Sequence, residues 1–336
     1  MRVLFIGGTG KISSACTQLA VEQGIDLYLL NRGRTTERAV PPNLHTLIGD
    51  IRAPETVAAA LGDLTFDAVV NWITYTPAQL QIDLDLFRGR TKQYVFISSA
   101  SAYQKPLSGL PITESTPLAN PFWEYSRNKI ACEEMLMAAY RADGFPFTIV
   151  RPSHTYDKTM WPFNGGYTVV HRMRQGKPVI VHGDGSSLWT LTHHRDFAKG
   201  FVPLLGNNHA IAEAVHITSD ESLSWEQIYH ICADAAGVAD PKLVHVPSDL
   251  IAAYDPAWGA ALLGDKAHSV VFDNSKLKRL VPGFAATIPF CHGVRDVVAW
   301  YDADPARQVI DPAMDRTIDA ILAAYAQVWP AGAPIH

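Results

Sequence analysis

Short apolar runs alternate with amphipathic helical segments through the first half of the chain, and this alternation restricts the fold more than any other feature. Apolar runs of about four to six residues joined by helices are typical of strands buried on both faces of a parallel sheet. Right-handed crossovers then give a doubly wound α/β sheet that binds ligands at the carboxyl ends of its strands. The predicted strands are 3–6, 26–30, 45–49, 68–71, 94–98 and 147–151, and the predicted helices are 13–23, 55–61, 78–87 and 125–142.

A glycine-rich turn follows the first predicted strand and opens the first predicted helix. Glycines let the backbone approach a pyrophosphate closely, and a helix N-terminus offers free N–H groups and a favourable dipole. The sequence therefore predicts that the pyrophosphate of a dinucleotide binds here, the alternative being an ordinary tight turn. The turn runs Gly7-Gly8-Thr9-Gly10-Lys11-Ile12, with Ser13 where such turns usually carry a third glycine.

The pattern of short strands and helices loosens after Arg151 and Pro152. We therefore expect a nucleotide-binding domain over residues 1–155 and a smaller, mostly substrate-binding region over residues 156–336. Some strands of this second region are expected to return to the main sheet. The elements predicted in it are the strands 214–218 and 243–246, the helix 225–236 and the terminal helix 311–327.

The end of the second predicted strand bears on the choice of nucleotide. An NAD site usually places a carboxylate there to hold the ribose hydroxyls, but this chain has Asn31 followed by Arg32 and Arg34. Asn31 does not repel a 2′-phosphate, and either arginine can pair with one. We expect NADP as the cofactor, with NAD as the alternative; solvated loop arginines are the other interpretation. Asp50, after the third strand, is placed to accept from an adenine amino group.

A serine and a tyrosine–lysine pair form the candidate chemical site. Ser99 follows the fifth predicted strand, while Tyr125 and Lys129 lie four residues apart and so project from one face of a helix. A lysine beside a phenol favours the phenolate and brings the tyrosine pKa toward the range of an acid/base catalyst. Ser99 is placed to hold the substrate oxygen while Tyr125 exchanges its proton.

These motifs resemble the extended branch of the short-chain dehydrogenase/reductase family, the NAD(P)-dependent epimerases and dehydratases. The resemblance is strongest up to residue 155 and continues through Gly183-Asp184-Gly185 and Asp196-Phe197-Ala198. It implies a Rossmann fold, a homodimer, and Ser99, Tyr125 and Lys129 as the catalytic residues, with Lys129 also holding the nicotinamide ribose. Along the cofactor it further implies Asp50, Ile51, Asn71, Trp72, Pro152 and His154.

Departures from the family pattern narrow the expected reaction and substrate. The sugar-nucleotide dehydratases of this family follow their Thr with an acidic pair, and here Ala100 and Ser101 stand in those places, which disfavours dehydration. Trp189 stands where family members that hold a nucleotide diphosphate usually carry an arginine. A small sugar, a polyol or an aromatic carbonyl compound is then as plausible as a nucleotide-sugar. Ser101, Trp161 and Trp189 are the candidate substrate contacts, with core packing the alternative for Trp161.

The leading hypothesis is an enzyme, either an epimerase or a dehydrogenase/reductase, that acts on a hydroxyl or carbonyl carbon of a sugar-like small molecule. The alternative is a non-catalytic relative that senses nucleotides or binds RNA. The chain carries 28 Lys and Arg against 33 Asp and Glu, a net charge of −5. This balance makes nucleic acid an unlikely partner, because phosphates need a basic surface.

Cysteine and histidine spacing bears on metals and on the cellular compartment. Cys16, Cys132, Cys232 and Cys291 lie far apart without a CxxC pair, which argues against a zinc ribbon and favours a reducing compartment. The His193-His194 pair has no carboxylate at ligand spacing, so we expect no metal. With neither a leader pattern nor a long apolar run in the sequence, we expect a cytoplasmic protein without a membrane partner.

Overall fold

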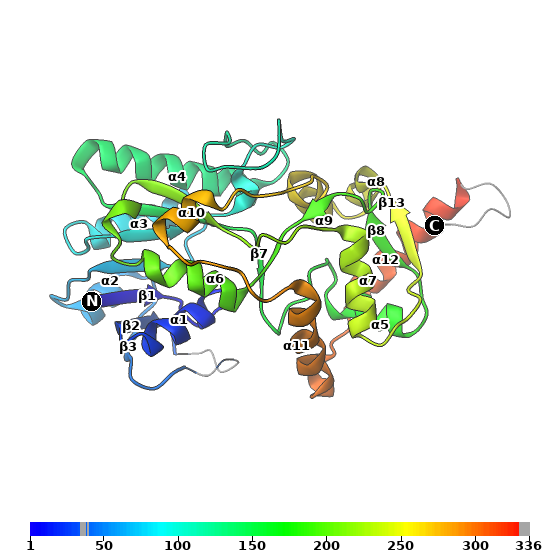
Figure 1. Cartoon of the computed structure of the whole chain (residues 1–336), viewed down its shortest axis with the longest axis horizontal. Helices are drawn as coiled ribbons and strands as arrows, with labels where there is room; N and C mark the ends of the chain where they lie inside the picture. Colours follow the sequence, from blue (N-terminus) through cyan, green and yellow to red (C-terminus); the bar gives the residue numbers. More distant parts are fainter. Residues whose placement is uncertain (34–37, 39, 329–336) are drawn as a thin grey trace.

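A seven-stranded parallel sheet forms the centre of the larger part of the molecule, in the order β11-β6-β5-β4-β1-β2-β3. The computed structural model describes residues 1–33, 38 and 40–328. The doubly wound α/β architecture is therefore confirmed (Figure 1). The strands of this sheet are β1 (Arg2–Ile6), β2 (Asp26–Asn31), β3 (His45–Ile48), β4 (Ala68–Asn71), β5 (Tyr94–Ile97), β6 (Phe147–Pro152) and β11 (Glu213–Ile217).

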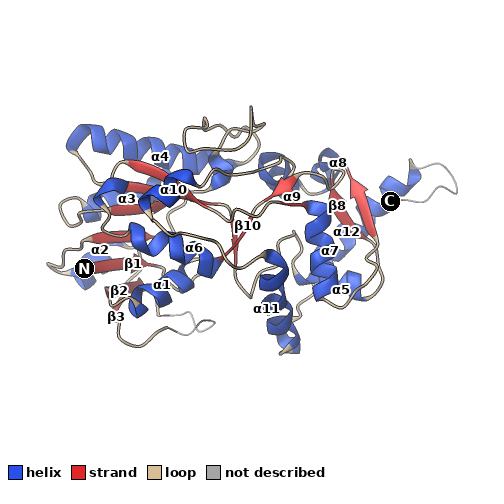
Figure 2. Ribbon diagram, in the orientation of Figure 1, coloured by secondary structure: helices blue, strands red, loops and turns tan. Residues whose placement is uncertain are grey.

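Helices cover both faces of this sheet (Figure 2). Alternate residues of β1 point to opposite faces, so Val3 and Phe5 pack in one hydrophobic cluster, and Leu4 and Ile6 in another. The first cluster contains residues of α1 (Ser13–Glu22), α6 (His194–Phe201) and α10 (Ser275–Leu280). The second contains residues of α2 (Pro54–Leu61), α3 (Pro77–Phe87) and α4 (Glu124–Asp143).

The elements predicted from the sequence match the observed ones, with ends that differ by at most one residue. Burial on both faces explains this agreement for the inner strands, because it leaves a continuous apolar run in the sequence. The edge strand β3 is mostly exposed. Strand β11, from the second half of the chain, pairs with β6 and completes the sheet. Leu136 of α4 is fully buried in the cluster against the sheet, so that side chain is not available to a dimer interface.

No described helix is both long and apolar enough to cross a bilayer.

A second part of the molecule packs helices around short strand pairs and has its own hydrophobic core. The strands are β7 (His154–Tyr156), β8 (Val179–His182), β9 (Leu188–Trp189), β10 (Leu191–His193), β12 (Leu223–Ser224) and β13 (Leu243–Val246). The helices are α5 (Tyr167–Arg174), α7 (Trp225–Ala235), α8 (Ser248–Tyr254), α9 (Pro256–Ala261), α11 (Phe290–Asp302) and α12 (Pro312–Gln327).

The described residues also form five short helical turns, and two of these turns matter for the site. The 3₁₀ turn η1 follows β5 and carries Ser101, while η4 is a π-helical turn that carries Asp265. A π-helical turn inside a helical segment is often found at functional sites. The five turns are η1 (Ala100–Ala102), η2 (Val202–Leu204), η3 (Asn208–Ala210), η4 (Leu262–Lys266) and η5 (Pro305–Arg307).

A buried ion pair ties α4 to the carboxyl ends of β5 and β6. Arg151 Nε donates to Glu133 Oε1 at 2.9 Å, and the side chains of the two residues are 5% and 4% exposed. The Ser98 hydroxyl donates to the same carboxylate oxygen. Helix α4 is thereby held in a fixed position against the strand ends that border the site described below.

Removal of the Glu133 carboxylate should be strongly destabilising, because the Arg151 guanidinium would stay buried without its partner. We expect Glu133→Ala to lower the free energy of unfolding by about 3–5 kcal/mol in urea titrations. The control is Lys92→Ala, in a pair with Asp67 whose Lys92 side chain is 81% exposed, and it should cost less than about 1 kcal/mol. Equal losses in the two variants would contradict the importance of the buried pair.

Candidate active site

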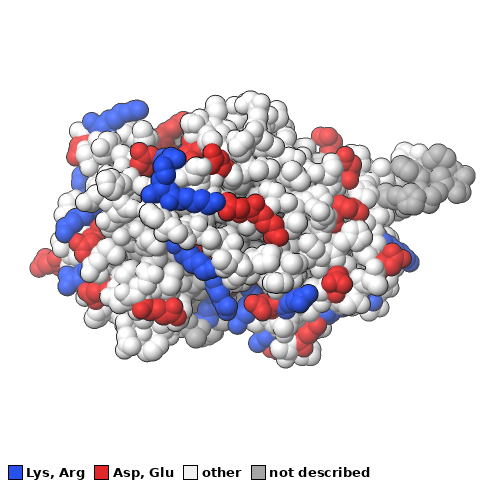
Figure 3. All heavy atoms as spheres, in the orientation of Figure 1, with Lys and Arg blue, Asp and Glu red and all other residues white. Residues whose placement is uncertain are grey.

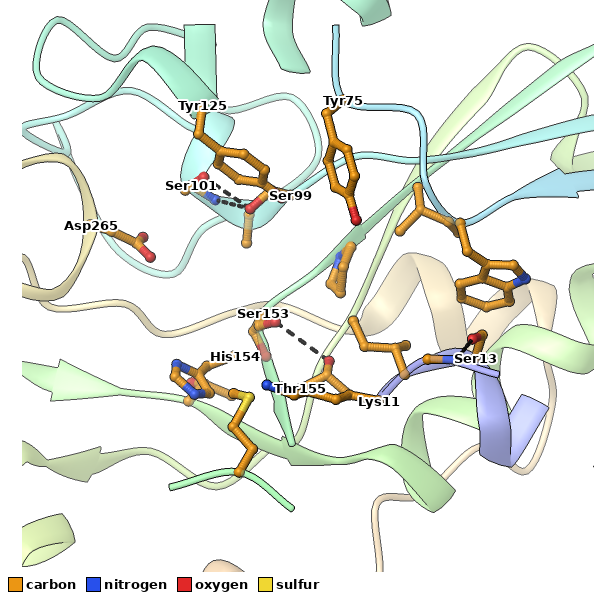
Figure 4. Close-up of a pocket in the computed structure, with 18 of the residues that line it drawn as sticks. Lys11, Ser13, Tyr75, Ser99, Ser101, Tyr125, Ser153, His154, Thr155 and Asp265 are labelled. Atoms are coloured by element: carbon orange, nitrogen blue, oxygen red, sulfur yellow. Dashed lines mark hydrogen bonds between the residues drawn. The ribbon is translucent and has the colours of Figure 1, made fainter. Parts of the chain in front are cut away.

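One cavity of about 520 Å³ opens at the carboxyl ends of the central strands. The glycine turn after β1 and the N-terminus of α1 form one wall, and the region after β5 and the start of α4 form another (Figure 4). Residues of β7, β9 and η4 complete it. The predicted site residues that line it are Gly7, Gly10, Lys11, Ile12, Trp72, Ser99, Ser101, Tyr125, Pro152, His154 and Trp189.

A positive φ, close packing and two hydrogen bonds fix the glycine turn after β1. Gly7 has φ of +82°, a conformation that favours glycine. A Cβ on Gly8 would lie 2.5 Å from Leu29 Cδ1, so this residue packs directly against β2. The Ser13 hydroxyl accepts from the Gly10 N–H at 2.8 Å and donates to the Gly7 carbonyl at 3.1 Å. Thr9, with Gly8, belongs to the turn without lining the cavity.

The end of β2 is built from an asparagine and an exposed arginine. Asn31 Oδ1 accepts from the Gly33 N–H at 2.8 Å, so its side chain closes its own loop. Arg32 Nη1 lies 3.9 Å from Asp50 Oδ2, and its side chain is 57% exposed. Ile51 is buried, and Arg34 lies outside the described residues. Within the described part of the chain, no carboxylate occupies the strand end itself.

Three serine hydroxyls form a chain that ends at Ser99. Ser126 Oγ donates to Ser101 Oγ at 2.7 Å, so the proton of the Ser101 hydroxyl is free to point to Ser99 Oγ, 2.9 Å away. Ser99 Oγ also accepts from the Ser101 N–H at 3.2 Å. Since Ser99 then accepts two hydrogen bonds, its own proton is available to an oxygen in the cavity. Figure 4 shows the two contacts between Ser99 and Ser101.

Tyr125 and Lys129 occupy different depths of the same helix face. Tyr125 lines the cavity, while Lys129 lies beneath it and is 2% exposed. Lys129 Nζ donates to the carbonyls of Thr74 and Ile97, both at 2.7 Å. It also lies over the rings of Tyr75 and Tyr125, at 4.7 and 5.7 Å from their centroids. The two side chains are therefore neighbours, as their spacing predicts.

Burial dominates the protonation of both groups. It raises the pKa of Tyr125 to about 12, although the nearby Ser99 hydroxyl acts in the opposite direction. It also lowers the pKa of Lys129 to about 7. The predicted lowering of the tyrosine pKa by the lysine is thus absent here, because loss of hydration disfavours the charged form of each group. The cavity holds a neutral phenol above an amine that titrates near neutrality.

Asn71 is the last residue of β4 and Trp72 follows it, and their side chains lie in different environments. Trp72 lines the cavity, whereas the Asn71 side chain is buried and donates to both oxygens of Asp83 at 2.9 Å. Burial raises the pKa of Asp83 to about 6. Thr74 also donates to Asp83, at 2.6 Å, and the Thr74 carbonyl accepts from Lys129. Asn71 therefore supports the loop beside the cavity and does not line it.

His154 and the two predicted tryptophans lie toward the second part of the molecule. Burial, together with the charges of Lys266 and Lys11, lowers the pKa of His154 to about 3, so its imidazole is neutral. Trp189 lines the main cavity. Trp161 instead lines an adjoining cavity of about 190 Å³, which His154 also borders. Trp161 stacks on Phe163 with ring centroids 5.9 Å apart.

The structure adds cavity residues that sequence reasoning missed, above all Asp265 and Lys266 on η4. Tyr75 and Trp123 also line the cavity. Asp265 and Lys266 follow no motif, and only the fold brings them to this wall. Within the described ranges, no three or more His, Cys, Asp or Glu residues gather in a cluster that could bind a metal. His193 Nδ1 instead accepts from the Arg195 N–H at the start of α6.

Comparison with known proteins places these features in a family. The model of the NAD dependent epimerase/dehydratase family matches residues 3–217. A chloroplast stem-loop binding protein of Arabidopsis thaliana is 26% identical over 262 residues, which are 73% of this chain and 65% of that protein. The chain thus spans less than two thirds of this relative. A 2′-dehydrokanamycin reductase of Streptomyces kanamyceticus is 26% identical over 84% of this chain and 80% of that protein.

Solved structures agree on the fold. A UDP-glucose 4-epimerase of Thermus thermophilus, solved in complex with NAD, superimposes with a TM-score of 0.71 at 21% identity. The match covers 90% of this chain and 99% of that one. At this level of identity, the likeness shows the shared architecture of the sheet and the second part.

The low pKa of Lys129 should make stability depend on pH. An unfolded lysine has a pKa of about 10.4, so between pH 7 and 10 the folded chain binds fewer protons, and this group makes stability rise with pH. We expect the unfolding free energy of Lys129→Met, minus that of the wild type, to fall by roughly 1.4 kcal/mol per pH unit in this window. Urea titrations at several pH values measure it.

The matched control for this experiment is Lys92→Met, which removes an exposed lysine. Its difference from the wild type should stay nearly constant between pH 7 and 10. A Lys129→Met difference that is equally constant would show that Lys129 is charged throughout this window in the folded chain.

Proposed function

The chain belongs to the NAD dependent epimerase/dehydratase family, and from this premise we propose that it is an NADP-dependent oxidoreductase or epimerase. Its substrate would be a sugar or a sugar-like small molecule that reacts at a hydroxyl or carbonyl carbon. The observation that carries the proposal is the single cavity in which the glycine turn, Ser99 and Tyr125 meet. That arrangement would join a nucleotide site to a proton carrier.

The residues of the turn and of the neighbouring strand ends fit a dinucleotide. Gly7 through Ile12 would hold the pyrophosphate, since Gly8 leaves no room for a side chain against β2 and the N-terminus of α1 borders the cavity. Asp50 and Ile51 would lie along the adenine, and Trp72, Pro152 and His154 along the nicotinamide. When bound, the cofactor supplies a nicotinamide ring that accepts or donates hydride.

The preference for NADP rests on the end of β2. Asn31 carries no charge, and Arg32 is exposed with its guanidinium 3.9 Å from the nearest Asp50 oxygen. An arginine in this position can pair with a 2′-phosphate. Arg34 would assist from the adjoining loop. NAD remains the competing cofactor, because Asp50 pairs with the same arginine and so competes with a 2′-phosphate for it.

Tyr125 would exchange the proton of the substrate hydroxyl or carbonyl oxygen. Ser99 would hold that oxygen with the proton that its two accepted hydrogen bonds leave available. Lys129 would stabilise the phenolate and hold the nicotinamide ribose from beneath. With a pKa of about 7, roughly half of the Lys129 side chains carry, near neutral pH, the positive charge that would stabilise the phenolate. Ser101 then acts through Ser99, because its hydroxyl links the Ser126 hydroxyl to the Ser99 hydroxyl by hydrogen bonds.

A small sugar-like molecule is as plausible a substrate for this cavity as a nucleotide-sugar. Among the described residues that line the cavity, the cations are Lys11 and Lys266, and no arginine is present. Trp189 offers a flat ring face on which a sugar can stack. Trp161 lines the adjoining cavity, so it would contact a substrate only if that substrate extends beyond the main cavity. The absence of a carboxylate at Ala100 and Ser101 keeps dehydration the less favoured reaction.

Neither nucleic acid nor a membrane is part of this proposal. Lys and Arg are interspersed with Asp and Glu on the face shown in Figure 3, and the net charge is −5. Although one relative is named for stem-loop binding, a proton carrier inside a nucleotide cavity serves a reaction and has no use in RNA binding. We retain, as parts of the proposal, a cytoplasmic homodimer and the functional division near residue 155.

Replacement of Tyr125 by phenylalanine tests the proposal. Loss of the phenol proton should reduce kcat by about 10²–10⁴-fold, while NADP⁺ still binds with an affinity close to that of the wild type. Turnover is measured by nicotinamide absorbance with sugars, polyols and their keto derivatives, and by product analysis with UDP-glucose.

The matched control is Tyr140→Phe, which removes the phenol of a 40% exposed tyrosine on the same helix. It should leave kcat unchanged. If Tyr125→Phe turns substrate over as fast as this control, Tyr125 is not the proton carrier and the proposed mechanism is wrong.

A further inference from the structure

Asp265 contributes a carboxylate to the cavity from a distant part of the chain. It lies on the π-helical turn η4 and lines the same cavity as Ser101 and Tyr125. Figure 4 shows its carboxylate directed toward the open space bordered by Ser99, Tyr125 and His154. The mechanism proposed above assigns this group no role.

The Asp265 carboxylate accepts no side-chain hydrogen bond from the residues that the structure describes. Among the described residues, no donor contacts it and no cation lies within 4.0 Å of it. Burial raises its pKa, which the charges of Lys266, Lys105 and His268 partly oppose. Asp265 is partly exposed and lines the cavity, so its carboxylate is accessible to a hydrogen-bond donor of a ligand.

A buried asparagine fixes the position of this turn. Asn120 Nδ2 donates to the Gly264 carbonyl at 2.6 Å and to the Ser101 carbonyl at 2.9 Å. Asn120 Oδ1 accepts from the Trp123 N–H at 3.0 Å, at the start of the helix that carries Tyr125. One amide therefore joins the three segments that carry Asp265, Ser101 and Tyr125.

Close packing reinforces this arrangement. A Cβ on Gly264 would lie 2.7 Å from Trp123 Cβ, so the turn that carries Asp265 sits directly against the loop before α4. The backbone of the turn that carries Asp265 is thus fixed in the wall of the cavity that Tyr125 also lines. A group presented in this way is suited to recognition of a ligand, since it needs little ordering when the ligand binds.

The charges around Asp265 decide which donor it can accept. Lys266 Nζ lies 5.7 Å from the ring centroid of Trp189 and 5.8 Å from that of Trp123. Lys105 is 3% exposed, and its ammonium has no hydrogen-bond partner in the described chain. With two ammonium groups already acting on the carboxylate, a cationic ligand would be repelled by them. A neutral hydroxyl meets no such repulsion.

We propose that Asp265 accepts a hydrogen bond from a second hydroxyl of the substrate, away from the reacting carbon, and so selects polyhydroxylated molecules. This inference rests on the proposed function, because Tyr125 and Ser99 would hold the reacting oxygen. The tryptophan ring beside Lys266 supplies the flat apolar surface that a sugar or cyclic polyol also needs. Asp265 is then a residue that determines specificity and leaves the proton transfer to Tyr125.

Equilibrium binding tests this without any turnover. Isothermal titration of the NADP⁺-saturated full chain compares myo-inositol, D-glucose and D-mannitol with cyclohexanol, which has a single hydroxyl. The wild type should bind at least one of the three polyols, and Asp265→Ala should weaken that binding at least tenfold. Cyclohexanol affinity should change less than twofold. Asp265→Asn, which keeps a hydrogen-bond acceptor, should lose less than Asp265→Ala.

The control is Asp249→Ala, which removes an exposed carboxylate on α8 outside both cavities; it should bind every probe like the wild type. Polyol binding that is unaffected by Asp265→Ala, or a wild type that binds none of the three polyols, would overturn the inference. Failure of the proposed chemistry is a separate outcome. If Tyr125→Phe retains normal turnover, the proton carrier is wrong, but the polyol affinities of the wild type and of Asp265→Ala are not affected by that result.

Discussion

Burial of a parallel sheet on both faces is the constraint from which the rest of the structure follows. Seven parallel strands bring their carboxyl ends to one edge, and the backbone groups and loops at that edge are left to bind ligands. The glycine turn after β1, Trp72 after β4 and Ser99 after β5 meet there for this reason. Helix α4 adds Tyr125 because the Glu133–Arg151 pair holds it against the same strand ends.

Loss of hydration at this edge shapes the chemistry. It keeps the Tyr125 phenol neutral, brings the pKa of Lys129 to about 7 and leaves His154 uncharged. The charge in the cavity therefore depends on a few side chains, and hydrogen bonds fix the positions of Lys129 and Ser99 there. The Thr74 and Ile97 carbonyls hold Lys129, and the hydroxyl chain through Ser101 orients Ser99.

The sequence predicts the sheet and most of the cavity because their signals are local. A buried strand leaves an apolar run, and Tyr125 and Lys129 share a helix face through their spacing alone. The environment of each side chain is not local: Asn71 turns to Asp83, and Lys129 reaches carbonyls of two other segments. Asp265 comes from a turn without a motif, and contacts with Asn120 and Trp123, from distant parts of the sequence, hold that turn beside the site.

The most direct test of the central claim is the identity of the nucleotide that the protein binds. Freshly purified protein, and protein dialysed against NADP⁺ and NAD⁺ together, is denatured, and the released nucleotide is identified and counted by mass spectrometry. We predict one dinucleotide per chain, with the mass of NADP(H). Retention through purification would favour an epimerase, and binding only after dialysis a dehydrogenase/reductase. Release of neither dinucleotide from either sample would contradict a nicotinamide site in this cavity.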